Sequence, residues 1–256
     1  MHFYKPNGSS MHTIIGKNGK ERTTSIADAR KLGLFPSVTT VMDVQAKPAL
    51  IEWLQQELLA AVIDKPYHPD EWTVETYRKA MLINMRIKSK KAANRGTEIH
   101  NLLESFFKSG GFDLEEEDNE YIISTVKLID EIFGLDGWIS EKSFANTKLG
   151  FAGCVDLYHP EKNIIVDFKT KDKENLKGVK QYDDHKMQLA AYQLGLEMPS
   201  NTRRFNLFIS TNIKTPGLCL LEECTEFGRY SSMFSYLHAF WMIKHKYDPR
   251  KYGELK

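Results

Sequence analysis

The sequence is poor in cysteine and has no long hydrophobic run. Its three cysteines, Cys154, Cys219 and Cys224, are too few for a disulfide framework and form no paired CxxC motif. Such cysteine usage suits a reducing compartment. No apolar run approaches the roughly 20 residues that a membrane-spanning helix needs. The N-terminal stretch MHFYKPNGSSMH has neither the apolar core of a signal peptide nor an Arg-rich transit pattern. These absences predict a protein of the cytosolic type with no membrane partner.

An excess of one charge is also absent, since 35 Lys and Arg residues nearly balance 34 Asp and Glu residues. The charges are unevenly placed, however. The stretch RIKSKKAANR, residues 86–95, is basic without any acid, and a second basic run starts at Lys169 and includes Lys171. A single run of this kind is usually a solvated helix face. Two runs that bracket a carboxylate motif favour a polyanion, such as nucleic acid, as the partner.

What the sequence does contain is a clear succession of helical and strand patterns. Asn-Gly turns at residues 6–9 and 17–20 indicate hairpins near the N-terminus. Helical spacing predicts helices over 48–63, 74–87, 97–108, 119–133, 178–196 and 227–246. Gly96 interrupts the pattern, and Thr97 is the expected N-cap of the helix that follows. Five β-rich stretches between residues 137 and 224 predict strands.

This order predicts a mixed α/β (α+β) fold, in which a central mixed sheet is flanked by helices. A chain of 256 residues suits one large domain or one domain with an added lobe. We expect residues 1–95 to form a hairpin and helical lobe packed on a core of residues 96–256.

Two aspartates stand in apolar strand patterns, within the stretch FAGCVDLYHPEKNIIVDFKT. A hairpin around HPEKN would bring Asp156 beside Asp167, and Lys169 would share the face of Asp167 because alternate strand residues point the same way. A buried Asp–Lys ion pair is one interpretation, although it leaves one carboxylate over. An ordinary exposed sheet edge is the second. The third is a site for Mg²⁺ or Mn²⁺, which favour oxygen ligands.

Polar pairs on two predicted helices fit the third interpretation. His100 precedes Glu104 by one helical turn in GTEIHNLLE, and Gln188 precedes Tyr192 by one turn in QLAAYQLG. Each pair also has an ordinary alternative, because a lone histidine is commonly structural and an amphipathic helix has a polar edge. The residues alone leave these alternatives open.

Four motifs, in the order GTEIH, GFAGCVDLY, IIVDFKT and QLAAYQLG, resemble those of the RecB-type branch of the PD-(D/E)XK nuclease superfamily. The upstream stretches PSVTTVM and KPALIEW also resemble phage and mitochondrial genome maintenance exonucleases of that branch. The resemblance spans residues 36–196. It implies a restriction-endonuclease-like core that hydrolyses DNA phosphodiesters with Mg²⁺ or Mn²⁺.

The resemblance also implies metal ligands. His100, Asp156 and Asp167 would bind the metal, and the backbone carbonyl of Phe168 and the carboxylate of Glu141 are further candidates. Some relatives carry four cysteines that hold an iron–sulfur cluster. The cysteines of this chain cannot supply such a set, so we expect no iron–sulfur cluster.

The same resemblance assigns the remaining site residues. Lys169 would position and activate the attacking water, while Gln188 and Tyr192 would order the site and the DNA backbone. The basic runs would make sequence-independent contacts with DNA phosphates. Their candidate residues are Arg86, Lys88, Lys90, Lys91, Arg95 and Lys171.

The expected activity is that of a metal-dependent DNA exonuclease acting on single-stranded DNA or duplex ends in replication, recombination or repair. A structure-specific endonuclease of the same fold is one alternative, and it ranks second because no sequence-reading motif is apparent. A non-catalytic DNA-binding subunit of a processing complex is the other. The expected location is the cytoplasm of a bacterial or phage-infected cell rather than the mitochondrial matrix.

Overall fold

The computed structural model describes residues 1–110 and 119–252, so most of the acidic run at 113–120 lies outside the described residues. The chain forms two compact units. The first contains Met1–Gln45 and Leu102–Lys256, and the second contains Ala46–Asn101. The first 45 residues therefore belong with the sheet, a division that differs from the expected boundary at residue 95.

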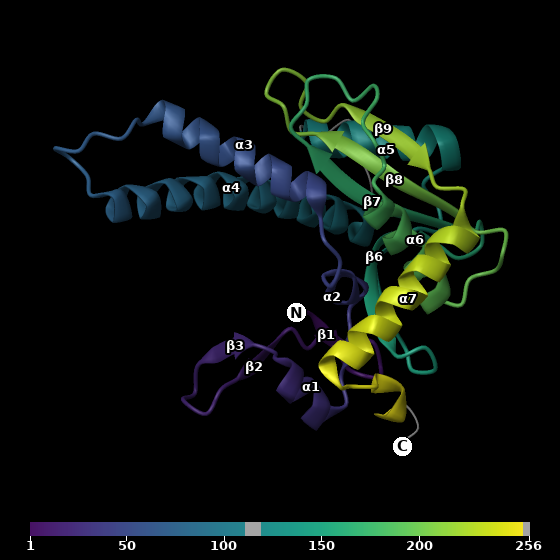
Figure 1. The fold of residues 1–256 in the computed structure, drawn as a ribbon. Coiled ribbons are helices and arrows are strands. Elements are labelled where there is room, and N and C mark those ends of the chain that lie inside the picture. The colour runs from purple at the N-terminus through teal and green to yellow at the C-terminus, as the bar shows by residue number, and fades with distance from the viewer. Residues whose placement is uncertain (111–118, 253–256) are drawn as a thin grey trace. The chain divides into compact units, whose positions relative to one another are not determined.

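A five-stranded mixed sheet forms the centre of the first unit (Figure 1). Its strands, adjacent in chain order, are β5 (Ile139–Asn146), β6 (Phe151–His159), β7 (Ile164–Lys171), β8 (Arg203–Ser210) and β9 (Cys219–Glu223). β7 and β8 are parallel, whereas the other neighbouring pairs are antiparallel. A parallel pair needs a crossover connection, and α6 (Asp183–Gly195) provides it. The expected mixed sheet flanked by helices is confirmed.

Helices α5 (Glu120–Phe133) and α6 cover opposite faces of this sheet. Phe205 of β8 contacts Phe133 of α5, with 5.1 Å between the ring centroids. Phe208 of the same strand contacts His185 of α6 at 6.0 Å. Because residues 205 and 208 are an odd number of positions apart, they point to opposite faces of the strand. Asn206 is two residues before Phe208, so it also points to the α6 face. Asp167 and Lys169 of β7 are the partners of Asn206 and Phe208 in the β7–β8 register, and they share that face.

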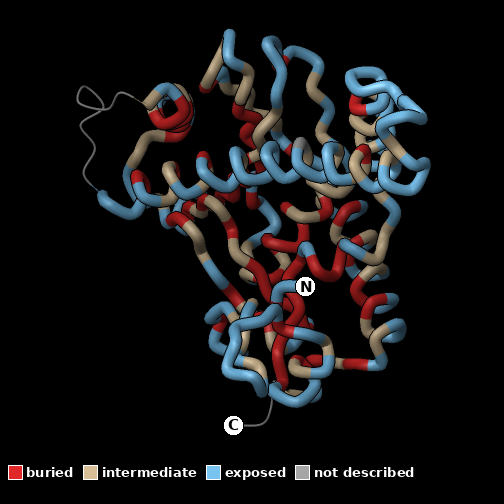
Figure 2. Tube along the Cα trace, turned by 90° about the vertical axis from the view of Figure 1, so that its left-hand side faces the viewer, coloured by how far each residue is buried: buried red, intermediate tan, exposed pale blue. Residues whose placement is uncertain are grey.

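The N-terminal segment completes the core on the α6 side. Its elements are β1 (Phe3–Tyr4), β2 (Thr13–Ile15), β3 (Glu21–Thr23), α1 (Ile26–Leu32), β4 (Phe35–Pro36) and α2 (Val38–Met42). The hairpin of β2 and β3 closes around the second predicted Asn-Gly turn. Buried residues of this segment, of α6 and of α7 (Phe227–His245) form one hydrophobic cluster. Figure 2 colours the buried parts of the chain red. Burial of this cluster holds α6 against the sheet.

Two helices dominate the second unit. α3 (Pro48–Asp64) begins at Pro48 as expected, because proline suits the first turn of a helix. α4 (Val74–Ser109) is one continuous helix, so the predicted break at Gly96 and the predicted N-cap at Thr97 were wrong. A helical glycine costs only about 1 kcal/mol, and the Thr97 hydroxyl instead donates to the carbonyl of Ala93 at 3.1 Å. Within residues 1–110 and 119–252, no helix has the length and apolar character to cross a membrane.

Candidate active site

β6 and β7 part at the two predicted aspartates. Their antiparallel pairing ends at Leu157 and Val166. Beyond that point β6 stays paired with β5, and β7 stays paired with β8. The next residues along the two separating strands are Asp156 and Asp167. The sheet therefore opens where the sequence predicted a carboxylate site.

The Asp156 side chain substitutes for a backbone partner at this opening. Its Oδ2 accepts a hydrogen bond of 2.7 Å from the backbone N–H of Phe168. Phe168 is buried, and a buried N–H needs an acceptor. One carboxylate thus holds the strand that carries the other.

The Asp167 carboxylate is almost fully buried and lies among hydrogen-bond donors. Its Oδ2 is 2.5 Å from Lys169 Nζ and accepts a 3.2 Å hydrogen bond from Asn206 Nδ2. Burial lowers the pKa of Lys169, but the charges of Asp167, Asp156 and Asp184 outweigh it and hold that pKa above its ordinary value. Lys169 is therefore an ammonium ion that offsets the charge of Asp167.

Asn206 is a site residue that the sequence reasoning missed. It stands opposite Asp167 in the β7–β8 register and is fully buried. Its Oδ1 has no hydrogen-bond partner within the described part of the chain. The signal was available, because Asn206 interrupts the apolar strand RRFNLFIS as the aspartates interrupt theirs.

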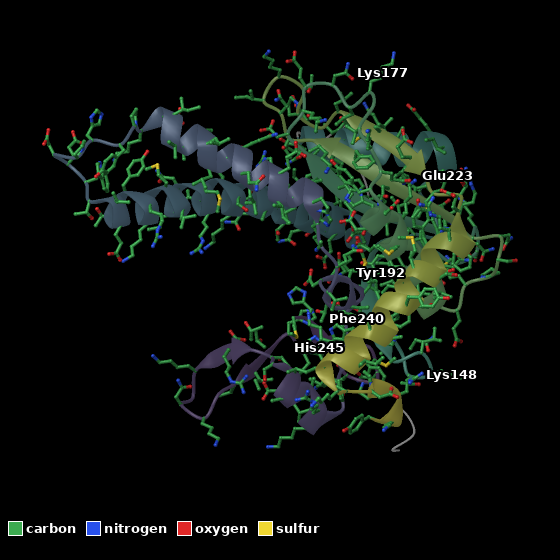
Figure 3. The ribbon with its side chains drawn as sticks, viewed as in Figure 1. Lys148, Lys177, Tyr192, Glu223, Phe240 and His245 are labelled. Carbon is green, nitrogen blue, oxygen red and sulfur yellow. The ribbon has the colours of Figure 1, made fainter. Side chains whose placement is uncertain are left out.

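Lys169 also joins a hydrogen-bonded chain on α6. Its Nζ donates to Gln188 Oε1 at 2.9 Å, and Gln188 Nε2 donates to Tyr192 Oη at 2.7 Å. Burial, and then the charges of Asp167 and Asp156, raise the pKa of Tyr192 (Figure 3) well above its ordinary value, so Tyr192 stays a neutral phenol. The structure thus brings together Lys169, Gln188 and Tyr192.

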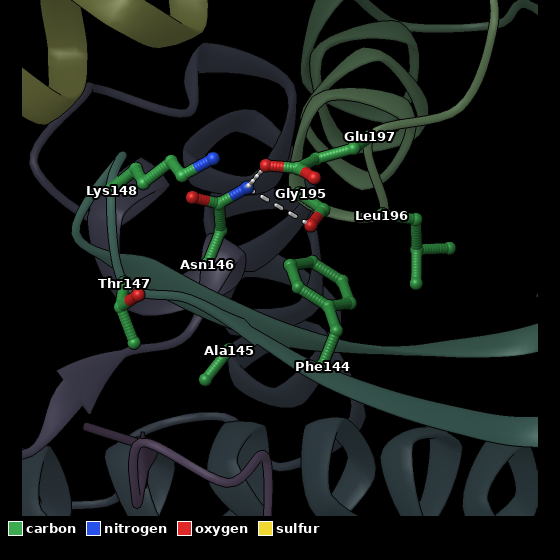
Figure 4. Close-up of a pocket in the computed structure, with 8 residues that line it drawn as sticks. All are labelled: Phe144, Ala145, Asn146, Thr147, Lys148, Gly195, Leu196 and Glu197. Carbon is green, nitrogen blue, oxygen red and sulfur yellow. Dashed lines mark hydrogen bonds between the residues drawn. The ribbon is translucent and has the colours of Figure 1, made fainter. Parts of the chain in front are cut away.

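Two motif glycines let α6 approach β6 closely. A Cβ atom at Gly153 would lie 2.9 Å from the ring of Phe144 and 3.1 Å from that of Tyr192. A Cβ atom at Gly195 would lie 2.0 Å from the Phe144 ring. Figure 4 shows Phe144 beside Gly195 in a pocket of about 330 Å³ at the end of α6, where Asn146 Nδ2 donates to the Gly195 carbonyl. None of the predicted site residues lines this pocket.

Glu141 lies on β5 between Ser140 and Lys142, which pair with Leu157 and Val155 of β6. Its φ of +50° is in the left-handed region, which residues other than glycine seldom adopt. The Glu141 Oε2 accepts a 3.0 Å hydrogen bond from Cys154 Sγ. Burial raises the pKa of Cys154 to about 12, and the hydrogen bond with Glu141 adds to this. The thiol is therefore protonated and donates its hydrogen bond to the Glu141 carboxylate.

The other predicted residues lie on α4 in the second unit, except Lys171, which ends β7. His100 is half-buried there, and its metal-binding role stays a prediction. Four candidate DNA-binding residues of this helix are exposed, namely Arg86, Lys90, Lys91 and Arg95, and Arg95 lies 3.3 Å from Glu98. The side chain of Lys88 is outside the described residues. DNA contacts by these residues also remain predictions.

The donor set at the opening fits a hard divalent cation. In the described ranges, no three or more His, Cys, Asp and Glu side chains gather into a metal-binding group. Mg²⁺, however, commonly takes only one or two protein carboxylates and completes its shell with water and substrate phosphates. Asp156 and Asp167 supply two carboxylates, and Asn206, which is hydrogen-bonded to Asp167, adds a buried Oδ1 without a partner in the described ranges.

Comparison with known proteins gives distant structural neighbours. No family model matches the chain, and no curated protein does. An alkaline exonuclease (LHK-Exo) from Laribacter hongkongensis is 16% identical with a TM-score of 0.38, over 80% of this chain and 99% of that one. The protein SSO0001 is 18% identical with a TM-score of 0.37, over 78% and 89%. A phage-related exonuclease from Haemophilus somnus 129PT is 13% identical with a TM-score of 0.30, over 63% and 83%. Because these scores are low, the neighbours establish no activity for this chain.

Proposed function

We propose that the protein is a Mg²⁺- or Mn²⁺-dependent deoxyribonuclease that removes nucleotides from the ends of single-stranded or duplex DNA. One observation carries the proposal. β6 and β7 separate at Asp156 and Asp167, and Lys169 lies hydrogen-bonded between Asp167 and Gln188. Two carboxylates with an adjacent ammonium group suit the hydrolysis of a phosphodiester.

Asp156 and Asp167 would hold the cation, with the carbonyl of Phe168 and the side chains of His100 and Glu141 as further candidate ligands. A bound divalent cation would supply charge neutralisation at the scissile phosphate and promote the formation of hydroxide.

Lys169 has the donors to orient the attacking water. An ammonium group has three N–H donors, and contacts with Asp167 and Gln188 account for two of them. The third is available for a water molecule or a phosphate oxygen. The bond from Gln188 to Tyr192 fixes the amide, which in turn fixes the ammonium group.

The carboxylates favour an enzyme over a module that only binds DNA. Two carboxylates repel a phosphate backbone, so a binding module would be better served without them. The basic residues of α4, together with Lys171, would supply the attraction to phosphates that binding needs.

The test is a cleavage assay with purified protein in Mg²⁺, in Mn²⁺ or in chelator. The substrates are end-labelled linear single strands and duplexes, with circular DNA beside them. We expect metal-dependent release of nucleotides from linear DNA alone. Asp167→Ala and Lys169→Ala should each abolish turnover, whereas the exposed controls Asp172→Ala and Lys214→Ala should retain it.

Three other outcomes would contradict the proposal or part of it. Full activity in the Asp167 or Lys169 variant would overturn the site assignment. Cutting of circular DNA at discrete positions would identify an endonuclease. Binding of DNA without metal-dependent cleavage would identify a binding subunit.

A further inference from the structure

One turn before Gln188, α6 carries His185, which faces the same side of the sheet as the proposed site. Its ring packs against Tyr182 with 5.3 Å between centroids, and against Phe208 with 6.0 Å. Phe208 is the β8 partner of Lys169 in the sheet register. The imidazole therefore lies beside the strand position that holds the proposed catalytic lysine.

The His185 ring has hydrogen-bonding capacity that its described surroundings leave unused. Nδ1 is buried and has no partner there. Nε2 is 3.9 Å from Asp184 Oδ1, beyond hydrogen-bond distance. Because a buried polar atom without a partner is destabilising by about 1–3 kcal/mol, such atoms are rare in native proteins. The unpartnered nitrogen beside the proposed site is a hydrogen-bonding group that a ligand bound there can use.

Two ammonium groups act on this ring. Burial, followed by the charges of Lys169 and Lys171, lowers the pKa of His185 to about 3, so the imidazole is neutral near pH 7. The Lys171 Nζ lies 5.3 Å from the centroid of the Tyr182 ring, which also contacts His185.

Lys171 is a half-buried cation that makes no ion pair within the described part of the chain. Burial, and then the charges of Lys169 and Lys173, lower its pKa, while Asp184 acts in the opposite direction. Lys169 is already neutralised by Asp167. The charge of Lys171 is thus left for an anion from outside the protein.

We propose that Lys171, His185 and Tyr182 form a subsite for one backbone phosphate of the DNA strand, next to the scissile position. Lys171 supplies the positive charge, and the neutral imidazole donates one N–H to a phosphate oxygen. Histidine χ2 has a broad two-fold profile, so the proposal includes a ring flip that turns a nitrogen toward the phosphate. The Tyr182 ring holds both groups through its contacts with the lysine and the imidazole.

This subsite rests on the proposed function, because it takes DNA as the ligand. Phosphate contacts position a strand without reading its sequence. A contact on Lys171, two residues after Lys169, would fix the register of the strand at the carboxylates. The subsite therefore predicts that one phosphate, at a constant distance from the cleaved bond, matters more than its neighbours.

The test is a scan with oligonucleotides that each carry a single uncharged methylphosphonate at successive positions from the labelled end. Binding is measured by fluorescence anisotropy in chelator, which makes the readout independent of cleavage. The cleavage rate is then measured with Mn²⁺. We expect wild-type protein to lose about tenfold in affinity at one position, as for the loss of a charged hydrogen bond. Lys171→Ala and His185→Phe should bind unmodified DNA about tenfold more weakly and should no longer distinguish that position.

Two further variants separate this subsite from a packing role. His185→Phe keeps a ring against Tyr182 and Phe208, whereas His185→Gln restores an amide donor and should partly recover the position-specific effect. The exposed Lys177→Ala (Figure 3) is the matched control from the same basic run, and it should keep the wild-type pattern.

The outcomes distinguish the subsite from the activity. A wild-type pattern retained in both His185→Phe and Lys171→Ala would overturn the subsite even if DNA is cleaved. The absence of any position-specific loss in wild type would do the same. The expected binding pattern without cleavage would refute the proposed function and leave the subsite standing.

Discussion

Replacing Asp156 by asparagine or by alanine should separate its role in the fold from its role in catalysis. The carboxylate accepts the Phe168 N–H at 2.7 Å, and it also stands at the strand opening as a proposed metal ligand. Asparagine keeps an acceptor oxygen of similar size but removes the charge. Alanine removes both.

The magnitudes follow from the hydrogen bond. A bond to a charged group contributes about 1.5–3 kcal/mol and a neutral one about 0.5–1.5 kcal/mol. Asp156→Asn should therefore lower the free energy of unfolding by about 1 kcal/mol. Asp156→Ala leaves the buried Phe168 N–H unpaired, so it should cost about 1–3 kcal/mol. Both variants should lose metal-dependent DNA cleavage.

Urea unfolding in chelator measures the loss of stability without a contribution from bound cation. The cleavage assay measures the loss of activity. Asp172→Asn is the control, because Asp172 is exposed and hydrogen-bonded to Asn212 at 3.0 Å. Its unfolding free energy should stay within about 0.5 kcal/mol of wild type. Cleavage at the wild-type rate by Asp156→Asn, or equal stability of the asparagine and alanine variants, would refute this reasoning.

Three further predictions concern packing and pH. Gly195→Ala should destabilise the fold by about 1–3 kcal/mol, because its Cβ meets the Phe144 ring at 2.0 Å, and Phe144→Leu should restore most of the loss in a thermal unfolding assay. Buried His238 has its pKa lowered by burial to about 4, so stability should be complete above about pH 6.5 and fall by up to about 3 kcal/mol as the pH drops toward 4. Urea titrations of wild type and His238→Gln at both pH values should show a smaller change in the variant. Arg204→Met should lower the free energy of unfolding by about 3 kcal/mol in total. The substitution removes hydrogen bonds that the buried guanidinium donates to two backbone carbonyls and an amide oxygen.

The central strands and the site on them could be predicted because each rule involved is local. The hairpin pattern around HPEKN placed Asp156 and Asp167 at neighbouring positions on two adjacent strands, although it did not reveal that the strands separate there. The i, i+4 spacing of Gln188 and Tyr192 placed both on one helix face. The hydrogen bond from Lys169 to Gln188 joins these elements, and it required only that α6 cover the face on which Lys169 lies.

The features that the sequence did not reveal depend on tertiary context. Gly96 signals a helix end in isolation, yet α4 continues through it because the intrinsic cost of one glycine is small. The association of the first 45 residues with the sheet follows from burial in a shared cluster, which no local pattern encodes. Asn206 and His185 can be recognised as candidate site residues only from their contacts with Asp167 and Tyr182.

The position of Lys169 depends on packing some distance along α6. Phe144 fits against Gly153 of β6 and Gly195 of α6 and thereby sets how closely the helix approaches the strand. Tyr192 lies between these contacts and holds Gln188, which holds Lys169. A shift of α6 at the Phe144 contact would therefore move the ammonium group relative to Asp167 while leaving the basic surface of the protein unchanged. Packing changes at this contact should then lower the rate of cleavage more than the affinity for DNA, the opposite of the effect expected from removing Lys171.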